Sequence, residues 1–154
     1  MRDIHPNGAA TFAAPQSHRL PIWTTVIAVG GVAWNLFGAV QFQAAVTATT
    51  ESLVASGLTP EQASVMTGYP GWMTLAFGIG VLGGLVGSVL LLLRHRLASW
   101  FLSISLMAYV ALWIGDAVHG VFAAMGAPQI IILSAVVVIA ALLFAVSRHA
   151  AVRS

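Results

Sequence analysis

An aspartate and a histidine near the end of one apolar stretch are the residues of this chain best suited to chemistry. Asp116 and His119 are three positions apart, so on a helix their carboxylate and imidazole project from one face. Such a pair could anchor a helix end at a membrane surface or bind a polar solute. Two ligands do not complete a metal site and no third is evident, so we expect neither a metal nor another cofactor.

The same helical face carries further polar and aromatic residues. At 100° per residue, Ser105, Tyr109 and Leu112 fall within about 40° of a direction shared with Asp116 and His119. This face would run from the middle of a membrane to its outer surface. Asp116 would lie about 28 Å from the start of its helix, near outer water.

Asn35 lies in a different apolar stretch, where it needs a hydrogen-bond partner. One interpretation gives it an interhelical hydrogen bond worth roughly 1 kcal/mol, with Asp116 and His119 as an interfacial anchor. The other gives it a ligand contact, with Trp34 beside it as a stacking surface. In the second case a polar crevice opening to the outside would be lined by Asn35, Trp34, Tyr109, Asp116 and His119.

The motifs of common enzyme classes are missing from the sequence. There is no serine nucleophile elbow, phosphate-binding loop, zinc-binding helix motif or pair of carboxylates. The absence of cysteine excludes a disulfide framework and a thiolate metal site. We therefore expect that the protein is not an enzyme.

The composition predicts a membrane protein. Hydrophobic residues make up 59% of the 154 positions and charged residues 6%, whereas a soluble domain has roughly 25% charged residues. Four stretches free of charge reach the roughly 20 residues that cross a bilayer, and in lipid such stretches form helices. We predict an all-α integral membrane four-helix bundle with spans at about 21–46, 69–93, 97–120 and 128–146.

The basic residues predict the orientation of these spans. All are arginines that flank spans on one side, whereas Glu51 and Glu61 lie in the only sizeable loop, on the other side. Because positive charge favours the cytoplasmic side, both termini are expected there. The arginines form no basic face, so we expect no nucleic-acid partner. The chain uses arginine and no lysine, which favours a bacterial, multi-pass protein of the cytoplasmic (inner) membrane. The arginines are Arg2, Arg19, Arg94, Arg96, Arg148 and Arg153.

This orientation divides the chain into three parts. Residues 1–18 are expected to form a disordered cytoplasmic tail, residues 19–148 the transmembrane domain with an outer loop at 47–68, and residues 149–154 a cytoplasmic C-terminal tail. In the outer loop, Thr59-Pro60-Glu61-Gln62 predicts the start of a short interfacial helix that ends near Met66.

The second span carries a ridge of small residues at i, i+4 spacing, which allows helix backbones to approach closely in lipid. The ridge could pack inside the bundle or form a contact between copies in a homo-oligomer. Gly78, in the same span, is expected to point away from it. The ridge consists of Ala76, Gly80, Gly84 and Ser88.

Several short motifs carry a resemblance to a known family. They are Trp34-Asn35-Leu36-Phe37-Gly38, Tyr69-Pro70-Gly71-Trp72 and Gly83-Gly84-Leu85-Val86-Gly87-Ser88, with Leu90-Leu91-Leu92-Leu93-Arg94 after them. In these motifs the chain resembles a family of small bacterial four-span membrane proteins whose members are often labelled sugar transporters. The resemblance covers most of the region from the first span to the third, and it assigns a role to no residue.

Two functions remain open on this basis. The protein could be a carrier for a small, sugar-like solute, which would require polar residues around a water-filled cavity open to one side. It could instead be a non-transporting accessory or scaffold membrane protein, whose bundle would be dry and fully packed.

Overall fold

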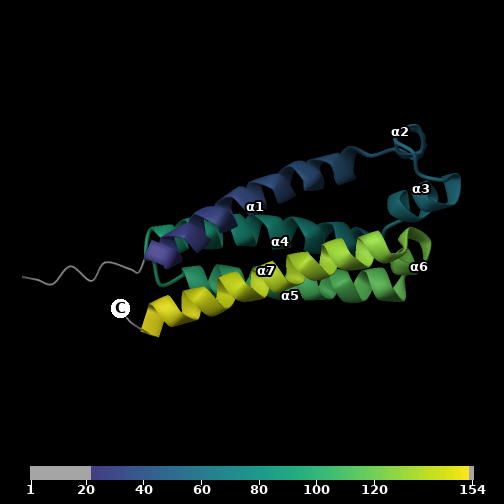
Figure 1. Ribbon diagram of the computed structural model, residues 1–154. Coiled ribbons are helices and arrows are strands. Elements are labelled where there is room, and N and C mark those ends of the chain that lie inside the picture. The colour runs from purple at the N-terminus through teal and green to yellow at the C-terminus, as the bar shows by residue number, and fades with distance from the viewer. Residues whose placement is uncertain (1–21, 153–154) are drawn as a thin grey trace, which may run out of the picture.

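The computed structural model describes residues 22–152, and in this range it contains seven helices and no strand. Four of the helices are long: α1 (Ile22–Thr47), α4 (Gly71–Leu92), α5 (Ala98–Val118) and α7 (Ala127–Val152). Each is long and apolar enough to cross a membrane. They run alternately up and down in one bundle (Figure 1). The predicted all-α, four-span membrane bundle is therefore confirmed.

The starts of the four long helices lie within two residues of their predicted positions. The end of α7 differs, because this helix continues to Val152 and not to about 146, so residues 149–152 extend the helix where a tail was expected. Neither glycine nor proline follows Ser147, and alanine and arginine both favour helix. The predicted tail at 1–18 lies outside the described residues.

A tight turn makes α4 and α5 antiparallel neighbours. Arg94 adopts a positive φ of 57°, a conformation that is uncommon for residues other than glycine. This conformation lets the backbone N–H of His95 donate to Leu90 O at 2.8 Å, which satisfies a carbonyl at the end of α4. The Nδ1 atom of His95 accepts a hydrogen bond from the Leu97 N–H at 3.2 Å.

The helices of the bundle pack in a definite order. The central helix α4 packs on α5 and α1, whereas α7 packs mainly on α5. Contact between α1 and α7 is limited, and α1 leans away from α7 along the bundle (Figure 1). The core is therefore built chiefly around α4 and α5.

Three short helices cover the end of the bundle toward which α1 diverges, and we call them the cap: α2 (Thr50–Ala55), α3 (Pro60–Thr67) and α6 (Val121–Met125). As predicted, Thr59 caps α3. Its side chain accepts from the Gln62 N–H at 3.2 Å, and Gln62 Oε1 accepts from the Thr59 N–H at 3.0 Å. Gln62 Nε2 donates to Ala124 O at 3.1 Å and thereby joins α3 to α6.

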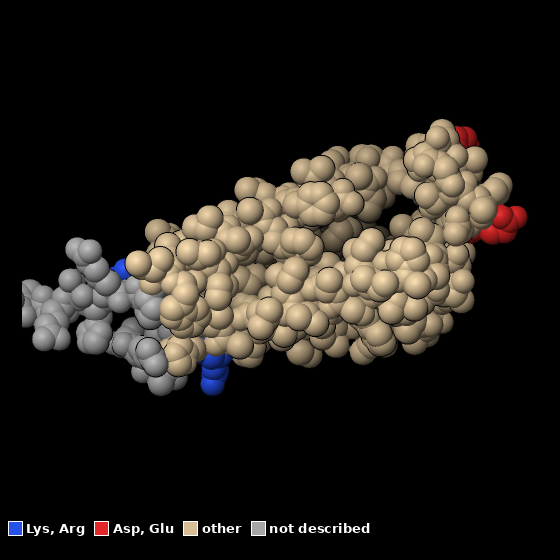
Figure 2. Space-filling view, viewed as in Figure 1, with Lys and Arg blue, Asp and Glu red and all other residues tan. Residues whose placement is uncertain are grey.

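Charge separates the two ends of the described chain. The acidic residues Glu51 and Glu61 lie on the cap, and the described arginines lie at the opposite end, which we call the arginine end (Figure 2). Helix α1 begins and α7 ends at this arginine end (Figure 1). The described arginines are Arg94, Arg96 and Arg148.

Candidate functional site

The small-residue ridge of α4 packs inside the bundle. A Cβ added to Gly80 would lie 2.7 Å from the Tyr109 ring, and one added to Gly84 would overlap the Asn35 amide. Ala76 and Ser88 are buried as well. The ridge thus makes the intramolecular contacts that were one of its two predicted roles. A homo-oligomer through α4 stays a prediction, and it would need the outward-facing apolar side chains Leu75, Leu82 and Val86.

Gly78 was expected to point away from the ridge, but this position is not free of helix contacts. Gly78 is buried, and a Cβ added to it would lie 3.0 Å from the Phe42 ring of α1. A contact between α4 and α1 therefore lies beside the small ridge, because α1 covers one side of α4 and α5 covers another.

Asn35 points into the bundle but uses its own helix as hydrogen-bond partner. Its side chain is 2% exposed, and Nδ2 donates to Gly31 O at 2.8 Å. The amide lies directly against Gly84, where no side chain separates the two helices. Asn35 therefore fills the space that the glycine leaves and satisfies a donor within α1.

A small void lies beside Asn35 at the centre of the bundle, and we call it the bundle void. Its volume is about 10 Å³, room for about one water molecule. Ser105 on its wall donates from Oγ to Gly80 O at 2.6 Å, across the α4–α5 contact. Three of the five predicted crevice residues line this void, namely Trp34, Asn35 and Tyr109.

Asp116 is buried further along α5 and is 1% exposed. Its Oδ2 atom accepts a hydrogen bond of 2.8 Å from Gln129 Nε2 on α7. Its Oδ1 atom is buried without a partner. Gln129 was not among the predicted site residues, and only its position at the start of the last span, at the same depth as Asp116, could have indicated the pair.

His119 follows Asp116 by one turn but lies in other surroundings. It ends α5, where its backbone N–H donates to Gly115 O at 2.8 Å. Its exposed imidazole is tilted against the Trp72 ring, with centroids 6.0 Å apart. Trp72 in turn lies over Gly115, since a Cβ there would be 2.7 Å from the indole.

The His119 side chain lines a larger pocket between the cap and the bundle, which we call the cap pocket. Its volume is about 230 Å³. One wall is Tyr69, whose hydroxyl donates to Met66 Sδ at 3.2 Å. Burial, and to a lesser extent the negative charge of Asp116, raises the pKa of Tyr69. The pocket is lined by Ser64, Val65, Gly68, Tyr69, Pro70, His119 and Val121.

The predicted crevice residues thus fall into separate places. Trp34, Asn35 and Tyr109 meet at the bundle void, His119 lines the cap pocket, and Asp116 is buried between them along α5. The two spaces share no lining residue. Within residues 22–152, no group of three or more histidine, aspartate or glutamate side chains lies close enough to hold a metal ion.

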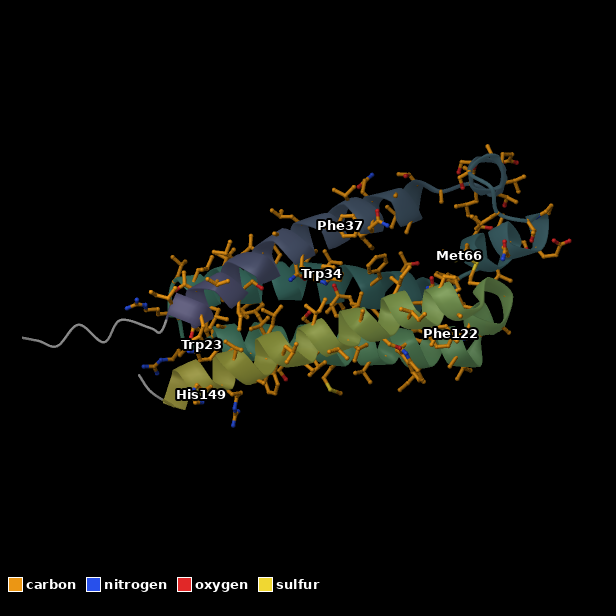
Figure 3. The ribbon with its side chains drawn as sticks, viewed as in Figure 1. Trp23, Trp34, Phe37, Met66, Phe122 and His149 are labelled. Carbon is orange, nitrogen blue, oxygen red and sulfur yellow. The ribbon has the colours of Figure 1, made fainter. Side chains whose placement is uncertain are left out.

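Figure 3 shows how the labelled aromatic side chains are distributed along the bundle. Trp34 and Phe37 project from the middle of α1, with ring centroids 6.2 Å apart. Trp23 and His149 lie near each other at the arginine end, with centroids 6.1 Å apart. Met66 and Phe122 lie at the cap end. The rings at the arginine end therefore join the first helix to the last, where α1 and α7 come together.

Comparison with protein-family models finds no match for this chain, and comparison with curated proteins and with solved structures finds no significant match either.

Proposed function

We propose that this chain is a non-transporting accessory protein of a bacterial cytoplasmic membrane, with both termini in the cytoplasm. The observation that carries the proposal is the packing of the bundle. The void shared by Trp34, Asn35 and Tyr109 measures about 10 Å³, and a sugar-sized solute needs many times the room of one water molecule.

The hydrogen bonds inside the bundle support the same function. Asn35 donates to its own helix and Ser105 donates to the backbone of α4. Asn35 and Ser105 thus use their donors within and between helices, whereas Ser88 Oγ is buried without a hydrogen-bond partner. A carrier would instead present such groups to a water-filled path.

The experiment that tests the proposal is solute uptake into proteoliposomes that contain the purified full chain. We expect the uptake of labelled monosaccharides to equal that of protein-free vesicles. If uptake exceeds that background, the Asn35→Leu and Asp116→Asn variants identify its source. Loss of uptake in either variant would establish a transport path through these residues and would overturn the proposal.

A small-solute carrier remains the second candidate, because the cap pocket of about 230 Å³ lies at one end of the bundle. The resemblance to proteins labelled sugar transporters favours the same candidate. In this alternative the cap pocket would be the entrance, and the bundle would have to open between α1 and α7, where its helices make few contacts. The uptake experiment separates the two candidates directly.

The proposed orientation rests on the separation of charge between the arginine end and the cap. Reporter fusions after Ser154 and before Pro21 should both report a cytoplasmic location, and a fusion near Gly57 an external one. An external signal from the fusion after Ser154 would contradict the orientation.

A further inference from the structure

The arginine end carries a group of exposed basic side chains, which we call the basic surface. One part is the turn between α4 and α5, with Arg94, His95 and Arg96, and the other is Arg148 with His149 on α7. All five side chains are exposed. Segments far apart in the sequence therefore bring their basic residues to the same end of the bundle (Figure 2).

No acidic side chain within residues 22–152 lies at this end. Glu51 and Glu61 lie on the cap, and Asp116 lies in the last turn of α5, toward the cap. The described part of the arginine end thus carries positive charge only. Charge complementarity favours an anionic partner for such a surface.

Exposed apolar side chains adjoin the basic ones. Leu93 and Leu97 flank the turn in sequence and are 70% and 44% exposed, and Trp100, one turn into α5, is 69% exposed. In a membrane, leucine side chains at this depth contact acyl chains, whereas tryptophan favours the boundary between acyl chains and headgroups. The partner must therefore offer an apolar part beside its negative charge. A phospholipid has both parts, whereas a soluble anion lacks the apolar one.

A tryptophan on a second helix marks the same boundary. Trp23, in the first turn of α1, is 45% exposed, and its ring lies 6.1 Å from the His149 ring (Figure 3). Trp100 lies about one helical turn, roughly 5 Å, inward of Arg96. Two tryptophans on different helices thus indicate that the basic side chains lie at the depth of lipid phosphates.

The guanidinium group is suited to this partner, because it can donate two parallel hydrogen bonds to phosphate oxygens. Every phospholipid has a phosphate, but a zwitterionic headgroup also brings an ammonium group. At the basic surface that ammonium group would meet positive charge and no described carboxylate. The surface therefore favours a headgroup with net negative charge.

We propose that the basic surface binds the headgroups of anionic phospholipids, with Arg96 and Arg148 at the phosphates and Trp23 and Trp100 beside the first carbons of the acyl chains. The test uses vesicles with the same lipids in both leaflets. Lipid binding can therefore hold or fail independently of the proposed orientation and of transport.

The test compares two brominated lipids with the same acyl chains, phosphatidylglycerol and phosphatidylcholine. Each is added in turn, as a small fraction, to phosphatidylcholine vesicles that contain the purified full chain. Bromine quenches tryptophan fluorescence on contact, so quenching measures how often each lipid lies beside the protein. One arginine near an anionic surface contributes a factor of about five. We expect phosphatidylglycerol to be favoured at least about fivefold, and equal quenching would overturn the proposal.

A charge variant tests the basic surface itself. Arg96→Gln combined with Arg148→Gln removes two charges and should lower the preference at least about fivefold. Glu51→Gln combined with Glu61→Gln changes the same number of charges on the cap and should change the preference little. An unchanged preference in the folded arginine variant would overturn the assignment. A change of the same size in the control would mean that net charge sets the preference, and would also overturn it.

Tryptophan variants locate the bound lipid in the native arginine background. Trp23→Phe combined with Trp100→Phe removes the reporters at the arginine end, so the excess quenching by phosphatidylglycerol should disappear. Trp113→Phe, toward the cap end of α5, should leave that excess in place. Excess quenching that persists without Trp23 and Trp100 would overturn the assignment.

Two controls complete the experiment. Circular dichroism melting shows whether each variant is folded, and the tryptophan variants carry the test if the arginine variant fails to fold. Glycerophosphoglycerol, the same headgroup without acyl chains, is then added in excess on both sides of the vesicles. We expect it to leave the preference unchanged. Loss of the preference would indicate a site for a soluble anion and would overturn the proposal.

Discussion

Substitution of Gly84 by alanine should destabilise the bundle through one contact with Asn35. An added Cβ would lie 2.8 Å from Asn35 Cγ and 3.0 Å from Nδ2. The amide cannot retreat easily, because it is buried and bonded to Gly31 O. Overpacking of this kind typically costs about 1–3 kcal/mol. Gly30 is the matched control, since nothing lies within 4 Å of a Cβ placed there.

Both variants make the same change in helix propensity, so the difference between them isolates the packing effect. The free energy of unfolding is measured by titration from a mild detergent into a denaturing one, followed by tryptophan fluorescence. We expect Gly84→Ala to be less stable than Gly30→Ala by about 1–3 kcal/mol. Adding Asn35→Ala to Gly84→Ala should recover part of this loss, because the added methyl group then has room.

Two results would refute the reasoning about this contact. Equal stability of Gly84→Ala and Gly30→Ala would mean that α1 and α4 do not approach at Gly84. Strictly additive effects of Asn35→Ala and Gly84→Ala would mean that the two residues do not touch, since residues in contact typically couple by about 0.5–3 kcal/mol.

Three further predictions concern polar groups of the described chain. Ser105→Ala removes a hydrogen bond between α5 and α4 and should lower the free energy of unfolding by roughly 0.6–1.7 kcal/mol in the same detergent titration; no change would contradict that role. The chain has two tyrosines, so in Tyr109→Phe the phenolate absorbance reports Tyr69 alone. Because burial and then Asp116 raise the Tyr69 pKa, that absorbance should appear only above the usual value of about 10. Stability should fall as the pH rises past that value, since the unfolded chain ionises first; normal ionisation near the usual pKa would be the contrary result. Gln129→Met should lower the free energy of unfolding by about 1–3 kcal/mol, because it leaves Asp116 buried without any partner. The double variant Asp116→Leu with Gln129→Met should be nearly as stable as the wild type. A double variant that shows the sum of two losses would contradict this.

The fold was predictable because lipid permits few alternatives for an apolar chain. The long stretches free of charge could only be helices, and their number and starts follow from length. Thr59-Pro60-Glu61-Gln62 predicted α3 for a local reason, since a capping box depends on neighbours in sequence. The equivalent pair Thr49 and Ser52 that begins α2 was not recognised, because serine at the third helical position is a weaker signal than glutamate or glutamine.

The grouping of the polar residues was much less predictable. Helical phase put Tyr109, Asp116 and His119 on one face of α5, but phase does not say which neighbour covers each turn of that face. In the structure Tyr109 meets Gly80, Asp116 meets Gln129, and His119 extends past the end of the helix. Which helix covers each turn is a tertiary property that no spacing within one helix contains.

The buried polar residues of the bundle have a role that membrane packing requires. Between helices in lipid the hydrophobic effect gives little preference for one alignment over another, so close contact and hydrogen bonds must select it. Asn35 fits only where α4 has a glycine, and Asp116 is matched by Gln129 on α7. These two contacts fix how α1 sits on α4 and how α7 sits on α5. A residue that fixes the alignment of two helices is poorly placed to bind a solute in passage, because releasing it would loosen the bundle.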